Sequence, residues 1–271
     1  MPELPEVETT RRSLEGGLAG RRVLLVQVRD RRLRWRVPEA LEQALSGATI
    51  TGLGRRAKYL LLGTDRGTAI IHLGMSGRLT LTDAATPVQR HDHIDVHLDD
   101  GGLLRYHDPR RFGSVHWTTA PPGDHPLLSG LAPEPLEPGF DGGYLHRVTR
   151  GRSAAIKVVI MNGNLVTGVG NIYASEALHL ARVDPRTRAG RLSQSRCDAL
   201  AGAIRETLAR AIEAGGTTLR DYVDGAGQAG RFQTQSAVYG RAGMPCPRCG
   251  HAVRTLRQGQ RATYFCPGCQ R

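Results

Sequence analysis

Four cysteines near the C-terminus constrain the fold more than any other feature of this sequence. They form two C-x2-C pairs, Cys246-Pro-Arg-Cys249 and Cys266-Pro-Gly-Cys269, with 16 residues between them. This spacing is typical of a structural zinc site, in which four thiolates leave no coordination position open. A redox-active dithiol is the alternative, but two matched pairs on a predicted hairpin favour zinc. The sequence therefore predicts one structural Zn²⁺ bound by Cys246, Cys249, Cys266 and Cys269, whose binding stabilises a separate module over residues 236–271.

The rest of the chain changes from a β-rich first part to a helical second part. Residues 3–18 predict a helix, and short apolar runs between glycine-bearing breaks predict strands after it. The predicted strands cover residues 23–28, 48–53, 59–62, 68–73, 93–98, 103–106 and 114–117, and a short helix covers 38–45. Later helices are predicted over residues 141–149, 153–161, 171–180 and 193–214. We therefore expect a mostly β domain over 1–118, a Pro- and Gly-rich linker over 119–140, a helical domain over 141–235, and the cysteine module.

The chain is strongly basic. It has 37 Lys and Arg residues against 25 Asp and Glu, which gives a net charge of +12 and a pI of about 10.2. Only Lys58 and Lys157 are lysines, and the planar arginine guanidinium suits phosphate groups and base edges. The composition predicts a polyanionic partner such as nucleic acid, while a basic protein without such a partner is the alternative.

No secretory or membrane-spanning segment is predicted. The N-terminus is acidic, no apolar h-region follows it, and no apolar run approaches the length of a membrane helix. We expect a cytosolic protein with no membrane partner.

The first six residues, Met-Pro-Glu-Leu-Pro-Glu, indicate a second kind of chemistry. If Met1 is removed, Pro2 becomes N-terminal and its nitrogen is a secondary amine. An α-amino group titrates at about 8, so a useful fraction is unprotonated near neutral pH and can attack an electrophilic carbon. The neighbouring Glu3 is suited to carry protons. The alternative is structural, because proline suits a first helical turn and glutamate suits the positive end of a helix dipole.

Two turns and a hairpin carry candidate nucleic-acid contacts. A glycine-rich turn over residues 162–170 joins two predicted helices, and Asn171 at the start of the second helix can bond a phosphate. The turn over residues 108–113 carries two arginines, and Phe112 and Met75 are candidate wedges between base pairs. A plain helical hairpin and two ordinary core side chains are the alternatives.

The segments around the cysteine pairs are also basic or polar. Arg254, Arg257 and Arg261 lie between the two pairs and predict a nucleic-acid contact, with a solvated charged hairpin as the alternative. Residues 217–235 have many Gly and Gln and few apolar side chains, which predicts a mobile loop. We expect Cys197, in a predicted helix, to be an ordinary thiol.

In this order, these motifs resemble bacterial formamidopyrimidine-DNA glycosylases over the whole chain. The shared motifs are Pro2-Glu3-Leu4-Pro5-Glu6, the isolated Lys58, residues 72–77, residues 108–113, the turn over 168–173, and the four-cysteine finger. Leu4 favours this branch over the related endonuclease VIII type, which usually has glycine there. The resemblance implies an α+β multidomain fold with an N-terminal β-sandwich and flanking helix, a helical helix-two-turn-helix domain and a C-terminal zinc-finger hairpin, with double-stranded DNA bound between the domains.

The resemblance also implies a bifunctional DNA repair enzyme. It would flip an oxidised purine, chiefly 8-oxoguanine or a formamidopyrimidine, out of the duplex. The Pro2 amine would form a Schiff base, the damaged base would leave, and β,δ-elimination would cleave the abasic strand. Glu3 is then the main proton carrier, Lys58 the proton donor in β-elimination and Arg261 the donor in δ-elimination. Because arginine hardly loses its proton, we interpret Arg261 first as a phosphate clamp.

The family's DNA contacts match further residues of this chain. Those that fill the gap left by the flipped nucleotide match Met75, Arg110 and Phe112, with Arg110 facing the orphan cytosine. Other contacts match His91, Arg152, Asn171 and, as a further candidate, His72; Arg150 lies close enough to weaken the match at Arg152. The 217–235 loop matches the family's flap over the damaged base. A monomer in the bacterial cytoplasm, associated with the nucleoid through DNA, is expected.

Two other functions remain open from the sequence. One is excision of oxidised pyrimidines, as in the endonuclease VIII type. The other is a non-catalytic zinc protein that binds damaged DNA, which would show salt-sensitive binding without strand scission. The presence of Pro2, Glu3 and Lys58 together argues against the second.

Overall fold

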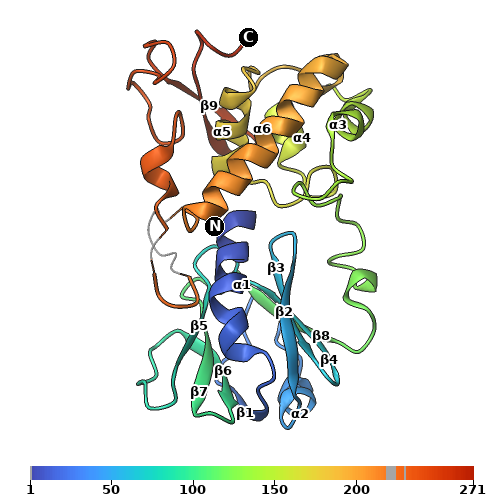
Figure 1. The fold of residues 1–271 in the computed structure, drawn as a ribbon, viewed down its shortest axis with the longest axis vertical. Helices are drawn as coiled ribbons and strands as arrows, with labels where there is room; N and C mark the ends of the chain where they lie inside the picture. The colour runs from blue at the N-terminus through green and yellow to red at the C-terminus, as the bar shows by residue number, and fades with distance from the viewer. Residues whose placement is uncertain (1, 218–223, 229) are drawn as a thin grey trace. The chain divides into compact units, whose positions relative to one another are not determined.

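The computed structural model describes residues 2–217, 224–228 and 230–271, and its contacts divide the chain into two units (Figure 1). The first unit comprises Met1–Ser129 and Ala214–Arg231, and the second comprises Gly130–Glu213 and Phe232–Arg271. Each unit has its own core and its own candidate site, so each is described by itself.

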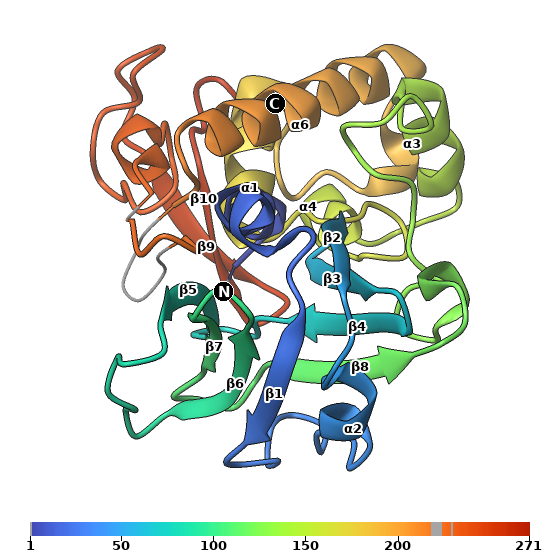
Figure 2. The ribbon, with the colours of Figure 1, turned by 60° about the horizontal axis from the view of Figure 1, so that its bottom comes forward.

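The first unit contains two four-stranded antiparallel sheets (Figure 2). One sheet has the order β1-β6-β7-β5, with β1 at Val23–Val28, β6 at Asp92–Leu98, β7 at Gly102–His107 and β5 at Arg78–Asp83. The other has the order β2-β3-β4-β8, with β2 at Ile50–Arg56, β3 at Tyr59–Thr64, β4 at Gly67–His72 and β8 at Ser114–Thr118. The short helix α2 (Leu41–Leu45) packs beside β1. The predicted β-sandwich is therefore confirmed.

One apolar core lies between the two sheets. It includes Leu60 and Ile71 from one sheet and Val96 and Leu104 from the other, all at most 5% exposed. The burial follows from the strand period of two, which directs alternate side chains to the same face. Helix α1 (Leu4–Leu18) adds its apolar stripe to this unit and packs against β2, so the N-terminus is anchored to the sandwich.

Most predicted elements of the first unit are present, with ends shifted by a few residues. The helix predicted over 3–18 is α1, and the run predicted over 23–28 is β1 without change. Strand β5, at Arg78–Asp83, was not predicted. Its Leu79 and Leu81 alternate with polar residues, which is a strand signal, but only Leu79 is fully enclosed because β5 lies at the sheet edge.

The second unit contains four α-helices and a β-hairpin. The helices are α3 (Gly142–Thr149), α4 (Ile156–Ile160), α5 (Asn171–Leu180) and α6 (Gln194–Glu213), and the hairpin strands are β9 (Arg254–Gln258) and β10 (Arg261–Phe265). Both α3 and α5 pack against α6, whose Leu200, Ile204 and Leu208 are buried at helical spacing. Two short 3₁₀ turns, η2 (Ala189–Arg191) and η3 (Phe232–Gln235), also lie in this unit, whereas η1 (Pro122–Asp124) lies in the first unit.

Most of the loop predicted over 217–235 is grouped with a different unit from the one expected from the sequence. Residues 218–223 and 229 lie outside the described residues. The structure groups Ala214–Arg231 with the first unit, whereas the sequence placed the loop with the helical domain. The physical reason lies in its backbone bonds, since Gly225 N donates to Ser13 Oγ at 2.9 Å and Gly225 O accepts from Leu81 N at 3.1 Å. The predicted domain boundaries otherwise stay predictions.

Among the described helices, none is both long enough and apolar enough to cross a membrane.

Candidate functional site

The N-terminal end of α1 holds Glu3 in a defined position. Glu3 is the residue that caps the helix, and it forms a capping box with Glu6, whose Oε2 accepts from Glu3 N at 2.7 Å. Glu6 Oε1 accepts from Thr217 N at 2.7 Å, so the same carboxylate also ties down the start of the 217–235 loop. Pro2 directly precedes this cap and is buried. The chain therefore presents the candidate amine and its candidate proton carrier from one rigid helix start.

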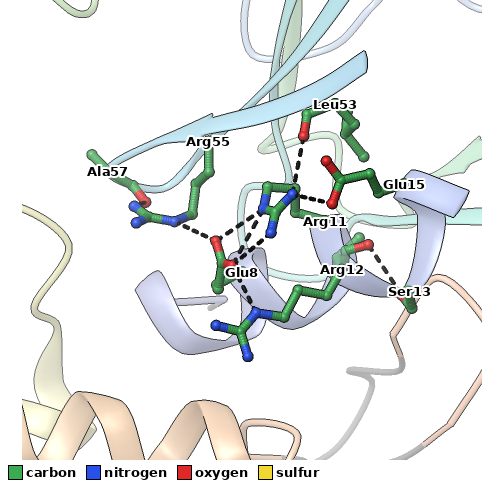
Figure 3. Close-up of polar contacts among 9 residues, drawn as sticks. Glu8, Arg11, Arg12, Ser13, Glu15, Leu53, Arg55 and Ala57 are labelled. Carbon is green, nitrogen blue, oxygen red and sulfur yellow. Dashed lines mark hydrogen bonds and ion pairs between the residues drawn. The ribbon is translucent and has the colours of Figure 1, made fainter. Parts of the chain in front are cut away.

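A second network fixes the turn that carries Lys58 (Figure 3). Glu8 Oε2 on α1 accepts from Arg55 Nε on β2 at 3.0 Å, and Arg55 also donates to the backbone oxygen of Ala57 at 3.0 Å. Ala57 lies in the left-handed region, with φ of 54°, and Lys58 follows it directly. The Lys58 turn is thereby connected to the same helix as Pro2 and Glu3.

Arginine contacts dominate the electrostatics of Glu8. Burial alone would raise the pKa of its carboxyl, but hydrogen bonds from Arg11, Arg12 and Arg55 outweigh this and lower the pKa from an ordinary 4.5 to about 2. Glu8 is therefore ionised at every physiological pH and acts as an anchor, not as a proton carrier.

His72 is a neutral hydrogen-bond donor in this structure. Burial and then the positive charges of Lys58 and Arg34 lower the pKa of its imidazole to about 4. Its Nδ1 accepts from Gly74 N at 3.0 Å, and because a backbone amide only donates, the proton must sit on Nε2. His72 can thus bond a phosphate oxygen without adding a positive charge.

The candidate wedge side chains project from two turns of the first unit. Met75 is 40% exposed and Phe112 is 45% exposed, so neither side chain is enclosed in the core. The Arg110 guanidinium lies over the Phe112 ring, 4.9 Å from its centroid. The ordinary-core alternative for Met75 and Phe112 is therefore wrong.

His91 lies beside the second of these turns. Its backbone oxygen accepts from Asp108 N at 3.0 Å, which places it next to residues 108–113. Its ring Nδ1 is enclosed and has no hydrogen-bond partner within the described parts of the chain. The structure therefore places His91 beside the turn over 108–113 but, among the residues that it describes, shows no partner for this nitrogen.

In the second unit, Asn171 is the first residue of α5 and contacts the finger hairpin. Its Nδ2 donates to Ala262 O at 3.0 Å, and its Oδ1 accepts from Lys157 Nζ at 2.6 Å. Lys157, which is 1% exposed, also donates to Thr263 Oγ1 at 2.8 Å and to Ala262 O at 3.2 Å. These contacts fix the start of β10, whose first residue is the exposed Arg261.

The two arginines near position 152 have different surroundings. Arg150 donates to the backbone oxygens of His146, Ala189 and Leu192, which gives it a structural role. Arg152 is exposed and donates through Nε to Val148 O at 2.7 Å. Arg152 is therefore the better placed of the two for a phosphate contact.

The four predicted zinc ligands come together in the finger. Their sulfur atoms all lie within 4.8 Å of one another, with Cys249 and Cys266 at 3.4 Å and Cys246 and Cys269 at 3.9 Å. A tetrahedral zinc with Zn–S bonds of about 2.3 Å needs sulfur–sulfur separations of about 3.8 Å. The cluster thus fits a closed Zn²⁺ site, as predicted, whereas Cys197 is buried in α6 away from this cluster.

Helix α5 supports the finger through two residues that the sequence did not single out. The Glu176 carboxylate accepts from the backbone N–H groups of Ala237, Val238 and Tyr239 at 2.7–3.0 Å. One turn further on, His179 Nε2 lies 3.3 Å from Cys246 Sγ. A donor to a metal-bound thiolate orients the ligand and stabilises the site.

The structure therefore distributes the predicted residues over both units. The first unit carries Pro2, Glu3, Lys58, His72, Met75, His91, Arg110 and Phe112, and the second carries Arg152, Asn171, Arg261 and the cysteines. Sequence reasoning missed Glu6, Lys157, Glu176 and His179. The Glu3-x-x-Glu6 spacing is a recognisable capping signature, but the others have no local signal because their partners are distant in the chain.

The fold and these groups define a two-unit protein with a four-cysteine zinc site in one unit and a β-sandwich in the other, whose flanking helix α1 begins just after Pro2. Three family models match successive parts of the chain: the formamidopyrimidine-DNA glycosylase N-terminal domain over residues 1–115, the formamidopyrimidine-DNA glycosylase H2TH domain over 131–223, and a zinc finger found in FPG and IleRS over 243–271. The chain belongs to the formamidopyrimidine-DNA glycosylase family. The resemblance drawn from the sequence is thereby confirmed, as is the predicted zinc finger.

Full-length relatives and solved structures agree with this assignment. The formamidopyrimidine-DNA glycosylases of Alkalilimnicola ehrlichii and Stutzerimonas stutzeri are 55% and 56% identical, with complete coverage of both chains. The MutM (Fpg) protein of Thermus thermophilus aligns with a TM-score of 0.88 at 38% identity, covering 99% of this chain and 98% of that one. Lactococcus lactis Fpg aligns over both full chains at 34% identity, with a TM-score of 0.90 for a mutant bound to Fapy-dG DNA and 0.91 for a complex with oxidised-pyrimidine DNA.

Proposed function

We propose that this chain is a DNA glycosylase and abasic-site lyase that removes oxidised purines such as formamidopyrimidines and 8-oxoguanine from double-stranded DNA. The observation that carries the proposal is the placement of Pro2 and Glu3 at the start of one helix, with the Lys58 turn bonded to that same helix through Glu8 and Arg55. Full-length relatives named formamidopyrimidine-DNA glycosylase support the glycosylase part of the proposal.

The reaction uses Pro2 as the nucleophile. After removal of Met1, the Pro2 nitrogen attacks C1′ of the flipped nucleotide, the C1′–N bond to the damaged base breaks, and the base leaves with a proton. The nitrogen then loses its own proton, the C1′–O4′ bond breaks as O4′ takes up a proton and the sugar ring opens, and an iminium forms between the nitrogen and C1′, with Glu3 carrying protons in these steps. An amine is required because water would form no iminium.

Strand cleavage follows from the acidity that the iminium gives to C2′. Loss of the C2′ proton expels the 3′ phosphate in β-elimination, and a second elimination expels the 5′ phosphate. Lys58 donates a proton in the first elimination, while Arg261 clamps a phosphate with its fixed charge. Arg261 has the exposure for this role at the start of β10.

DNA binding uses residues from both units. His72, His91, Arg152 and Asn171 contact phosphates, and Met75, Arg110 and Phe112 fill the gap left by the flipped nucleotide. The zinc held by the four cysteines folds the finger and takes no part in the reaction. The enzyme acts as a monomer on the nucleoid in the bacterial cytoplasm, where the thiolates that bind zinc stay reduced.

Borohydride reduction tests the proposed chemistry. Wild-type protein mixed with a duplex containing 8-oxoguanine should give a protein–DNA adduct. Its mass should correspond to protein without Met1 joined, through the reduced iminium, to DNA that has lost the damaged base. A variant that retains Met1 should bind DNA but give no adduct, because the Pro2 nitrogen is then an amide. Trapping by the Met1-retaining variant would refute the role of Pro2.

Oxidised pyrimidines are a second candidate substrate. The Lactococcus lactis relative has been solved with DNA containing an oxidised pyrimidine. Competition between 8-oxoguanine and thymine-glycol duplexes in one reaction measures the preference directly, and we expect 8-oxoguanine to be cleaved first.

A further inference from the structure

The carboxylate of Asp108 lies between two turns of the first unit, the one over residues 73–77 and the one over 108–113. Asp108 follows β7 directly and is fully buried. Its Oδ1 accepts from Ser76 Oγ on the first turn at 2.9 Å, and its Oδ2 accepts from Gly113 N on the second turn at 2.9 Å. One carboxylate therefore bonds to both turns.

Further bonds fix this carboxylate on all sides. Oδ1 also accepts from Arg110 N at 3.3 Å, and Oδ2 lies 3.4 Å from the Tyr106 hydroxyl. The same hydroxyl lies 3.3 Å from the backbone oxygen of His72, at the start of the first turn. The backbone oxygen of Asp108 is bonded to His93 Nε2 at 2.8 Å. A buried acceptor with this many partners is held in one position.

The two turns also touch through their backbones. A Cβ added to Gly74 would lie 2.4 Å from Gly113 N, and one added to Gly113 would lie 1.8 Å from the Tyr106 hydroxyl. Both positions must be glycine for the turns to approach this closely. The turns are therefore packed as one unit, and neither can shift without the other.

We propose that Asp108 is a positioning residue that sets both wedge turns before DNA binds. The proposal rests on the proposed function, because it concerns how Met75, Arg110 and Phe112 enter the duplex. These side chains leave the joined turns exposed to solvent, and the Arg110 guanidinium already stacks on the Phe112 ring. Turns held in place beforehand lose little conformational entropy when the wedges are inserted.

The variant Asp108→Asn tests the carboxylate with almost no change in volume. The Ser76 hydroxyl can rotate to accept from the new amide, but the backbone N–H groups of Arg110 and Gly113 can only donate. Whichever way the amide is placed, its NH₂ faces one of these donors. A second variant, Ser76→Ala, removes only the bond between the turns. Asp99→Asn, at an exposed hairpin turn, is the matched control.

The experiment compares two substrates with each variant. A duplex with 8-oxoguanine requires the wedges, whereas borohydride trapping on a single-stranded abasic oligonucleotide requires only the amine chemistry. We expect Asp108→Asn to lower kcat/KM on the duplex on the order of 10- to 100-fold and Ser76→Ala to lower it roughly threefold to tenfold. The yield of borohydride trapping on the single-stranded abasic oligonucleotide should be the same for both variants as for wild type. The fluorescence of 2-aminopurine placed opposite the lesion should increase less on binding of either variant than on binding of wild type.

The outcomes separate this inference from the proposed function. If wild type traps neither substrate, the proposed function fails. If wild type traps both and Asp108→Asn matches it on the duplex, the positioning role is overturned. Equal loss on duplex and single strand by a folded Asp108→Asn variant also overturns it, because the defect would then lie in the amine chemistry. If Asp108→Asn does not fold, an unchanged duplex-to-single-strand ratio for Ser76→Ala refutes the inference.

Discussion

The Glu8 anchor gives a prediction whose size and pH dependence both follow from the structure. Replacing Glu8 by Gln leaves three arginines around a neutral amide. The pKa of the Glu8 carboxyl falls from 4.5 to about 2 on folding, which corresponds to at most about 3 kcal/mol of stability at neutral pH. Arg12 is 59% exposed, so solvent screens part of this interaction. We therefore expect Glu8→Gln to reduce the free energy of unfolding by about 2 kcal/mol at pH 7.

The effect should shrink as the pH falls. Because the folded carboxyl has the lower pKa, the unfolded chain takes up the proton first, and the stabilisation is lost between the unfolded value near 4.5 and the folded value near 2. The difference between wild type and variant should be nearly constant from pH 7 to pH 5. It should fall by more than half by about pH 3.

Tryptophan fluorescence measures this unit alone. Both tryptophans of the chain, Trp35 and Trp117, lie in the first unit, so urea unfolding followed by tryptophan emission avoids signals from the zinc finger. Glu15→Gln is the matched control. The Glu15 carboxylate also bonds to Arg11 but is half-exposed, so this bond should contribute less than about 1 kcal/mol. A Glu8→Gln penalty below about 0.5 kcal/mol, or one equal at pH 7 and pH 3, would refute the reasoning.

Three single contacts give the remaining predictions. His72→Gln should leave unchanged the slope of the logarithm of the DNA-binding constant against the logarithm of the salt concentration, since His72 is neutral. Arg152→Gln should reduce the magnitude of this slope by about 1. Equal slopes for the two variants would contradict the assignment of charge. Lys157→Met should remove the bonds to Asn171 and β10, so amide hydrogen exchange should become faster in β10 but not in β7. Equal exchange in β10 of wild type and variant would count against a stabilising role of these Lys157 bonds. His179→Phe should weaken zinc binding on the order of tenfold in a chelator competition, and an unchanged affinity would show that its contact with Cys246 is not a supporting bond.

The sequence predicted those features that depend on local patterns. The cysteine spacing predicted the metal site, a short apolar run predicted β1, and an alternating run predicted β6. The Pro2-Glu3 start predicted where α1 begins, because the signals for a helix start lie in a few adjacent residues. At β5 the alternating pattern has only two apolar residues, Leu79 and Leu81, and so short a strand signal is easily passed over.

Contacts between distant residues could not be predicted in the same way. Glu176 is bonded to residues 61–63 positions away, and Lys157 to a residue 106 positions away. No periodicity records such pairs, since they depend on how whole elements pack. The same is true of the 217–235 loop, whose polar composition predicted mobility but not its attachment to Glu6 and Ser13.

Glu6 also explains how Glu3 can serve two purposes. A carboxylate that caps a helix and also carries protons must give up its cap when it moves toward the substrate. The backbone N–H of Glu3 is bonded to Glu6 Oε2, so the helix start keeps this bond whatever the Glu3 side chain does. Since the other oxygen of Glu6 bonds to Thr217 N, one buried carboxylate positions both the start of the 217–235 loop and the start of α1. A change at Glu6 should therefore disturb the loop and the chemistry together, whereas a change at Glu3 should disturb the chemistry and the helix cap but leave the bond from Thr217 N to Glu6 in place.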